Sequence, residues 1–143
     1  MAVIFFIFSN SAESGPESNA KSGAVAQFLA PLLNPFGRMD DAAFHKLVRK
    51  LAHFVEFAAL GFSLGGFACS MGLKRRGLCL ASAAGALAVA IADETVQHFT
   101  GRTDSWKDVL LDFSGAVCGI AVMCLAIWLL GQLQTRKRGK NHG

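Results

Sequence analysis

Charged side chains are scarce in this sequence. Only 17% of its 143 residues are Asp, Glu, Lys or Arg, whereas 52% are hydrophobic. Soluble globular domains carry about 25% charged residues, so the composition argues against an ordinary soluble protein. The imbalance comes from three apolar runs of 21 to 23 residues each, at residues 51–71, 78–99 and 109–131.

The chain also lacks the motifs that identify several classes of enzyme and metalloprotein. It has no Gly-rich phosphate loop, no nucleophile elbow, no HExxH and no CxxC. His53 with Glu56, and Glu94 with His98, could each form a metal pair, but no single segment supplies a compact cluster of three ligands. The four cysteines lie inside apolar runs, where we expect small buried hydrophobes: Cys69, Cys79, Cys118 and Cys124. We therefore expect no redox centre, no metal and no cofactor.

Each of the three apolar runs is long enough to cross a membrane. At about 1.5 Å per residue, some 20 helical residues span the roughly 30 Å hydrocarbon core. Only helices and closed barrels satisfy their backbone polar groups there, and these continuous Leu-, Ala- and Phe-rich runs favour helices. The sequence predicts an all-α membrane protein, an antiparallel bundle of three full transmembrane helices with the lipid bilayer as its partner.

The N-terminal part is expected to be less regular. Residues 1–8, MAVIFFIF, would cover only about 12 Å, and we interpret them as a truncated membrane segment. Residues 9–39 are predicted to be an external linker, irregular over 9–19, with a short amphipathic helix over 22–33 that is stopped by Pro31, Asn34, Pro35 and Gly37.

The remaining chain is predicted to form the membrane domain and a tail. Residues 40–131 make the domain, with an N-cap at Asp40 or Asp41. Residues 132–143 make a basic cytoplasmic tail. The three helices are expected at about residues 40–72, 78–99 and 108–131.

The net charge of +4 is explained by residues that flank the membrane segments. Basic clusters occupy residues 74–76 and 136–140, next to apolar runs. Such clusters mark the cytoplasmic side of a membrane, so no nucleic-acid partner is needed to explain them. This orientation predicts a multi-pass protein of the bacterial inner membrane, with the 9–50 segment and the 100–107 loop outside.

Ionisable residues within the membrane segments concentrate at one membrane face. In an antiparallel arrangement, the start of the first helix, the end of the second and the start of the third meet there. Because unpaired charges are costly in a bilayer, such groups pair or line a wet cavity. The predicted polar or ligand-binding cluster consists of Lys50, His53, Glu56, Asp93, Glu94, Gln97, Arg102, Asp108 and Asp112.

Helical spacing places small residues below these polar ones. Asp108, Asp112, Gly115 and Gly119 recur at intervals of three or four residues, and Ala86, Ala90, Asp93 and Gln97 do the same. Pairs of glycines four residues apart let helices approach closely. We therefore expect both stripes to face neighbouring helices.

Three segments resemble the VanZ-like family of small bacterial membrane proteins. KLAHFVEFAAL matches a K-x-x-H-x-x-x-(Y/F)-x-x-L pattern, DETVQHF matches D-E-x-x-Q-x-F, and GRTDSWKDVLLDFSG supplies the Arg, Asp and Gly that follow. The early FSN is similar to the family's Ser after its first helix. Asp112 departs from the pattern, which has Asn there, and most of the first membrane helix is absent.

The resemblance implies a link to teicoplanin-type glycopeptide resistance without supplying a molecular activity. Our first hypothesis is therefore a non-enzymatic protein that binds a lipid-linked or glycopeptide-type envelope ligand through Arg102, Lys50 and the acids. An alternative is a small membrane enzyme acting on a lipid headgroup or on an acyl or phosphoryl bond, with Glu94 or His53 as general base. A third is a structural subunit. Three or four membrane helices are too few for an ordinary transporter, so transport would require a homo-oligomer.

Overall fold

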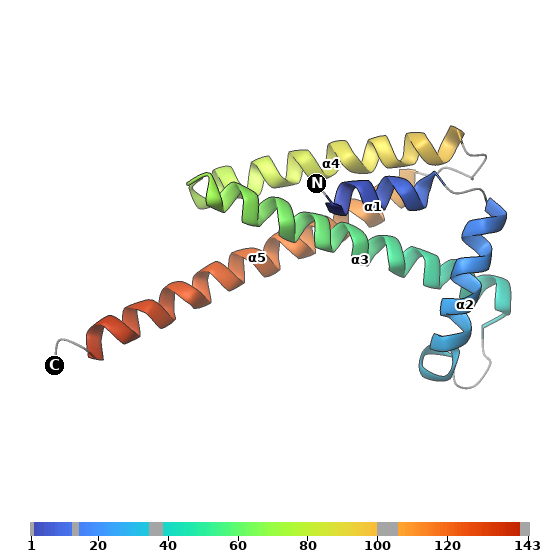
Figure 1. Cartoon of the computed structure of the whole chain (residues 1–143), viewed down its shortest axis with the longest axis horizontal. Helices are drawn as coiled ribbons and strands as arrows, with labels where there is room; N and C mark the ends of the chain where they lie inside the picture. The colour runs from blue at the N-terminus through green and yellow to red at the C-terminus, as the bar shows by residue number, and fades with distance from the viewer. Residues whose placement is uncertain (1, 13–14, 35–38, 100–105, 141–143) are drawn as a thin grey trace.

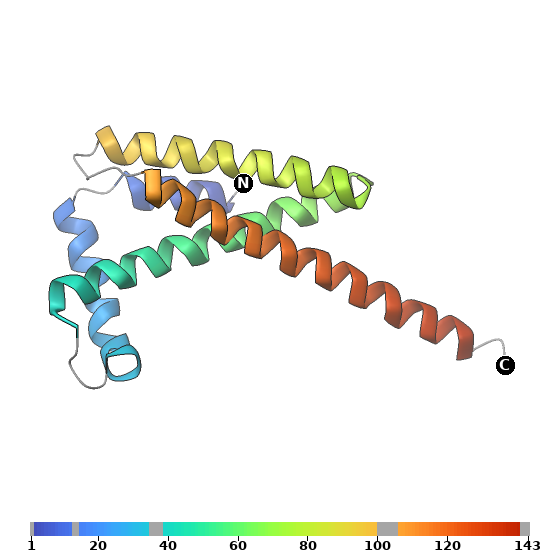
Figure 2. The ribbon, with the colours of Figure 1, turned by 180° about the vertical axis from the view of Figure 1, so that it is seen from behind.

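Helices make up the regular structure of this protein. The computed structural model describes residues 2–12, 15–34, 39–99 and 106–140, with side chains for 2–12, 23–32, 34, 39–99 and 106–133. Within that part, five helices follow one another: α1 (Ala2–Ser11), α2 (Gly15–Leu33), α3 (Asp41–Ser70), α4 (Arg75–Phe99) and α5 (Trp106–Lys140). Helix α4 runs antiparallel to α3 and α5 (Figures 1 and 2). The predicted all-α fold is confirmed.

Three of the described helices have the length and composition to cross a membrane. They are Asp41–Ser70, Arg75–Phe99 and the Trp106–Leu133 part of α5. Large apolar side chains cover their outer surfaces, as at Leu80, which is 72% exposed, and Phe67, which is 64% exposed. Exposing such a large apolar surface to water is unfavourable, whereas lipid tails, which are as apolar as these side chains, can surround it. The protein is therefore a multi-pass membrane protein.

The helices extend beyond the predicted apolar runs. Helix α2 begins at Gly15, inside the stretch expected to be irregular, and continues through Pro31 to Leu33. Helix α4 includes Arg75, and α5 continues to Lys140, well into the predicted tail. Hydropathy marks only the part of a helix that can sit in lipid, whereas Arg, Lys and Gln also favour helix in water.

The start of α3 follows the prediction. The Asp40 carboxylate accepts a 2.9 Å hydrogen bond from the Ala42 backbone N–H, as an N-cap does. Asp41 lies in the first turn, and the helix continues without a break to Ser70. Thirty residues at about 1.5 Å each exceed the bilayer core, so α3 is long enough to extend beyond it.

Glycines set the distance between α3 and α5, the two helices with the most extensive contact. A Cβ added at any of three of them would overlap backbone of the facing helix, which side-chain rotation cannot relieve. The close approach predicted for the stripe of α5 that contains Gly115 and Gly119 is confirmed. The contacts are Gly115 with Phe54, Gly119 with Ala58, and Gly61 with Ala116.

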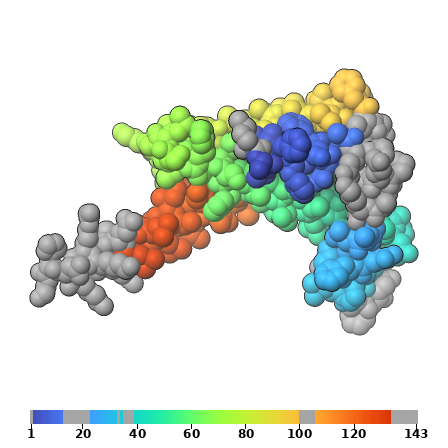
Figure 3. All heavy atoms as spheres, viewed as in Figure 1, coloured from blue at the N-terminus to red at the C-terminus, as the bar shows by residue number. Residues whose placement is uncertain are grey.

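Helix α1 packs between α3 and α4, where Figure 3 shows it on the surface of the bundle. Ile7 is fully buried in a core cluster with Phe57, Leu60, Ala86 and Ala90. Ten residues make a helix of only about 15 Å, so α1 covers part of the bundle. Its C-terminal end points towards the C-terminal end of α4 (Figure 1).

Candidate functional site

The buried face of α4 changes from alanine to polar residues towards the C-terminal end of the helix. Ala86, Ala90 and Asp93 are each 0% exposed, and Gln97 is 8% exposed. These residues form the stripe predicted from spacing, so the expected packing of this face is confirmed. A carboxylate that is fully buried among membrane helices needs polar neighbours.

Gln97 supplies one of those neighbours. Its Nε2 donates a 2.8 Å hydrogen bond to Asp93 Oδ2 and a longer, 3.4 Å one to the hydroxyl of Ser11 on α1. The other carboxylate oxygen, Asp93 Oδ1, is buried and has no hydrogen-bond partner among the described residues. Within the described part of the chain, one oxygen of Asp93 is therefore held by Gln97, and the other has no hydrogen-bond donor.

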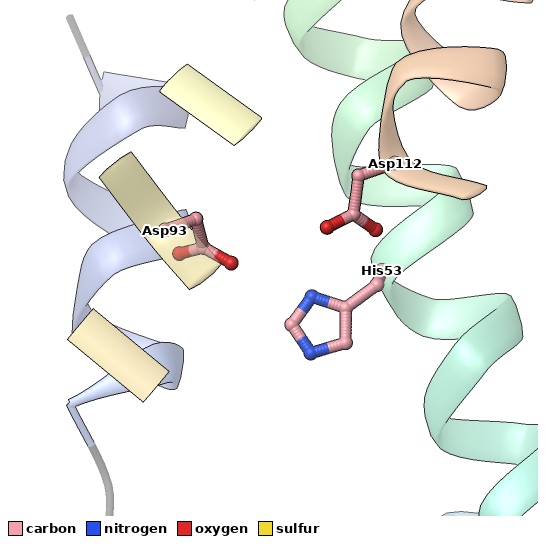
Figure 4. Close-up of side chains that lie close together, drawn as sticks. All are labelled: His53, Asp93 and Asp112. Carbon is pink, nitrogen blue, oxygen red and sulfur yellow. The ribbon is translucent and has the colours of Figure 1, made fainter. Parts of the chain in front are cut away.

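His53 of α3 and Asp112 of α5 lie beside Asp93. One ligand-type atom from each of the three side chains lies within 4.8 Å of the other two. Asp112 is 2% exposed, whereas His53 is half-buried. Figure 4 shows the three side chains converging from α3, α4 and α5. We refer to Ser11, His53, Asp93, Gln97 and Asp112 as the polar cluster.

Two further pairs lie beside the polar cluster. Lys50 of α3 forms a salt bridge and hydrogen bond with Asp108 of α5, and both side chains are partly exposed. Asn10 Nδ2 on α1 donates a 2.9 Å hydrogen bond to Glu56 Oε1 on α3. Lys50 thus links α3 to α5 through this salt bridge.

The structure brings together most of the predicted site residues. Glu94 is half-buried on α4, next to Asp93 in the sequence. Arg102 lies outside the described residues, so its predicted role as counter-ion or ligand clamp stays a prediction. Five predicted residues connect different helices. His53, Asp93 and Asp112 lie close together from α3, α4 and α5, and Lys50 of α3 pairs with Asp108 of α5.

Two polar residues of α1 are absent from the site predicted from the sequence. Asn10 contacts Glu56, and Ser11 is fully buried beside Gln97. A signal is present, because both lie just after an apolar segment: Asn10 ends the FSN stretch that is similar to the family pattern, and Ser11 follows it. The prediction of a linker from residue 9 onwards leaves these two polar side chains out of the predicted site.

The cysteines differ from the prediction of buried hydrophobes. Cys69 and Cys118 are exposed on the outer surface of the helices. Cys79 and Cys124 are half-buried, with their sulfur atoms 3.7 Å apart between α4 and α5. A largely apolar groove of about 630 Å³ lies beside them, with Trp128 in its wall. It opens within the apolar spans, where lipid chains can fill it, and lacks the acids of the polar cluster.

Comparison with known proteins identifies a family. A family model described as VanZ/LLP1 matches residues 1–129, which is most of the chain and includes all of the polar cluster. No curated protein and no solved structure matches.

Proposed function

The chain belongs to the VanZ/LLP1 family, and we propose that it binds a cell-envelope ligand through its polar cluster. The protein would act in the bacterial cytoplasmic membrane, with the cluster at the outer face. It would contribute to protection against glycopeptides of the teicoplanin type. Binding, and not chemical conversion, is the main activity in this proposal.

The burial of two carboxyl groups in membrane helices carries the proposal. Asp93 is 0% exposed and Asp112 is 2% exposed, and acids in such segments cost several kcal/mol when they are unpaired. Packing alone does not require them, because glycines already hold α3 and α5 together. Costly polar groups within a bundle are the usual mark of a site for a ligand or ion.

The chemistry of the described residues favours a ligand that donates hydrogen bonds. Carboxylates are acceptors when ionised, and acids outnumber bases in and around the cluster, where the Lys50 ammonium already binds Asp108. Glycopeptides and the peptide part of lipid-linked wall precursors present amide N–H, hydroxyl and amine donors. Arg102 would add a clamp for a ligand carboxylate or phosphate.

The sidedness of the membrane is the first condition of this proposal. With the four native cysteines replaced by Ala, Ala42→Cys should react with a membrane-impermeant maleimide in intact cells, whereas Leu73→Cys should react only after lysis. Ala42 lies near the start of α3 and Leu73 in the turn after it, both exposed. The reverse pattern would place the cluster at the cytoplasmic face and rule out an external ligand.

Ligand binding is tested with the conservative variant Asp93→Asn, which changes a fully buried acid of the cluster. Loss of a hydrogen bond to a charged group removes about 1.5–3 kcal/mol of binding free energy. We therefore expect fluorescent teicoplanin to bind membranes containing the variant roughly tenfold more weakly, or weaker still. Resistance in a susceptible strain should fall with it. The matched control is Asp41→Asn, an exposed acid outside the cluster. Equal binding by both variants, at equal protein level, would contradict the proposal.

Catalysis is a second candidate because an imidazole lies within 4.8 Å of two carboxyl groups. Such pairs serve as general acids and bases. The two functions separate in one assay: a binding protein releases the bound ligand unchanged, whereas an enzyme releases a product. Glu94→Gln would then abolish conversion while retaining binding if Glu94 is the base.

A further inference from the structure

Three potential metal ligands meet in the polar cluster although they are far apart in the sequence. The prediction that no metal binds rests on the lack of three ligands in any one segment. Helices α3, α4 and α5 supply one each: an imidazole from His53 and carboxylates from Asp93 and Asp112. Tertiary packing therefore removes the basis of that prediction. From this geometry we propose that His53, Asp93 and Asp112 bind one divalent transition-metal cation, such as Zn²⁺ or Mn²⁺.

The distances are compatible with a metal after small side-chain movements. Zinc binds nitrogen and carboxylate oxygen at about 2.0–2.2 Å, so neighbouring ligand atoms in a tetrahedral site lie roughly 3.4 Å apart. The three atoms here lie within 4.8 Å of one another. Rotation of the carboxylates about their side-chain torsions closes a difference of this size without moving a helix.

A second observation points to a ligand at this position. Asp93 Oδ1 is buried and has no hydrogen-bond partner among the described residues, whereas Oδ2 accepts from Gln97. Gln97 thus orients the carboxylate and leaves one oxygen to bind a cation. Hydrogen bonds of this kind fix metal-binding side chains in their productive orientation.

Charge also favours a divalent cation. Two carboxylates with a neutral imidazole carry a charge of −2, which one divalent ion cancels inside the membrane segment. The imidazole favours zinc or iron over magnesium and calcium, which prefer oxygen ligands, and the two carboxylates also suit manganese. Three protein ligands leave a fourth position open. The metal proposal does not rest on the envelope-ligand proposal, because the protein can bind a cation without that ligand.

The test is a calorimetric titration of Zn²⁺ into the purified full-length chain after treatment with EDTA. We expect one Zn²⁺ per chain. His53→Gln, Asp93→Asn and Asp112→Asn should each weaken binding at least about tenfold. The matched control His98→Gln changes an exposed histidine of α4 and should retain wild-type affinity. No saturable binding by the wild type, or wild-type affinity in all three site variants, would overturn the proposal.

A second measurement needs no variant at the site, in case those variants fail to fold. Mn²⁺ is loaded into His98→Gln protein, and pulsed electron paramagnetic resonance detects nitrogen bonded to the metal. One coordinated imidazole nitrogen is expected. A spectrum with oxygen ligands only would overturn the site, since His53 is an essential member of it. Neither readout depends on teicoplanin, so failure of the metal site and failure of the proposed function remain distinguishable.

Discussion

Replacing Gly119 by valine is expected to separate α3 from α5. A Cβ at this position overlaps the backbone carbonyl of Ala58, which cannot rotate away as a side chain could. Overpacking of a core costs about 1–3 kcal/mol and occasionally more, and a backbone clash belongs at the upper end. We therefore expect the free energy of unfolding to fall by about 3 kcal/mol, measured by titration of the purified protein with SDS.

The same helix provides a matched control for this substitution. Gly131 is exposed, and a Cβ added there meets nothing within 4 Å. Gly131→Val should therefore unfold at the wild-type SDS concentration. Equal stability of the two variants would mean that α3 and α5 do not approach as closely as the structure has them.

Loss of this contact would also disrupt the polar cluster. His53 belongs to α3 and Asp112 to α5, so their proximity depends on the glycine contacts between the two helices. Gly119 itself lies about two turns from Asp112 and is not a member of the cluster. Weaker Zn²⁺ binding by Gly119→Val, with normal binding by Gly131→Val, would connect packing to the site.

Replacing Gln97 by leucine is expected to destabilise the bundle by about 2 kcal/mol. Hydrogen bonds to charged groups contribute about 1.5–3 kcal/mol, and Gln97 donates the 2.8 Å bond to the fully buried Asp93. The variant leaves that carboxylate without its described donor. SDS titration in the presence of EDTA measures the loss without interference from a bound metal.

Two comparisons show whether the hydrogen bond is responsible. Ser11→Ala should cost less than about 1 kcal/mol, because its bond from Gln97 is 3.4 Å long. The double variant Asp93→Leu with Gln97→Leu should be more stable than Gln97→Leu alone, since removing both partners leaves no buried acceptor. A double variant at least as unstable as the single one would contradict this account.

The apolar periodicity of the sequence is enough to predict the spans. Length and composition determine where a helix can cross lipid, and the spacing of Ala86, Ala90, Asp93 and Gln97 identifies the buried face of α4. The glycines of α5 likewise mark a close contact. The helix ends are harder to predict, because the hydrocarbon core limits an apolar run but does not end a helix.

The antiparallel order expected for three consecutive spans also places Lys50, His53, Asp93, Asp108 and Asp112 at the same end of the bundle. Relative height along a helix follows from residue number, at about 1.5 Å per residue. This part of the site is therefore a property of the sequence. The sequence does not determine which of these side chains contact one another.

Only the tertiary structure decided those contacts. Lateral distances depend on how closely helices pack and how each is rotated, and neither quantity is encoded in the spacing of one segment. Lys50 therefore pairs with Asp108, α1 brings Ser11 to Gln97, and His53 meets Asp93 and Asp112. The sequence by itself determined a polar end on a membrane bundle, whereas the packing of α1, α3, α4 and α5 brought the side chains of His53, Asp93 and Asp112 together there.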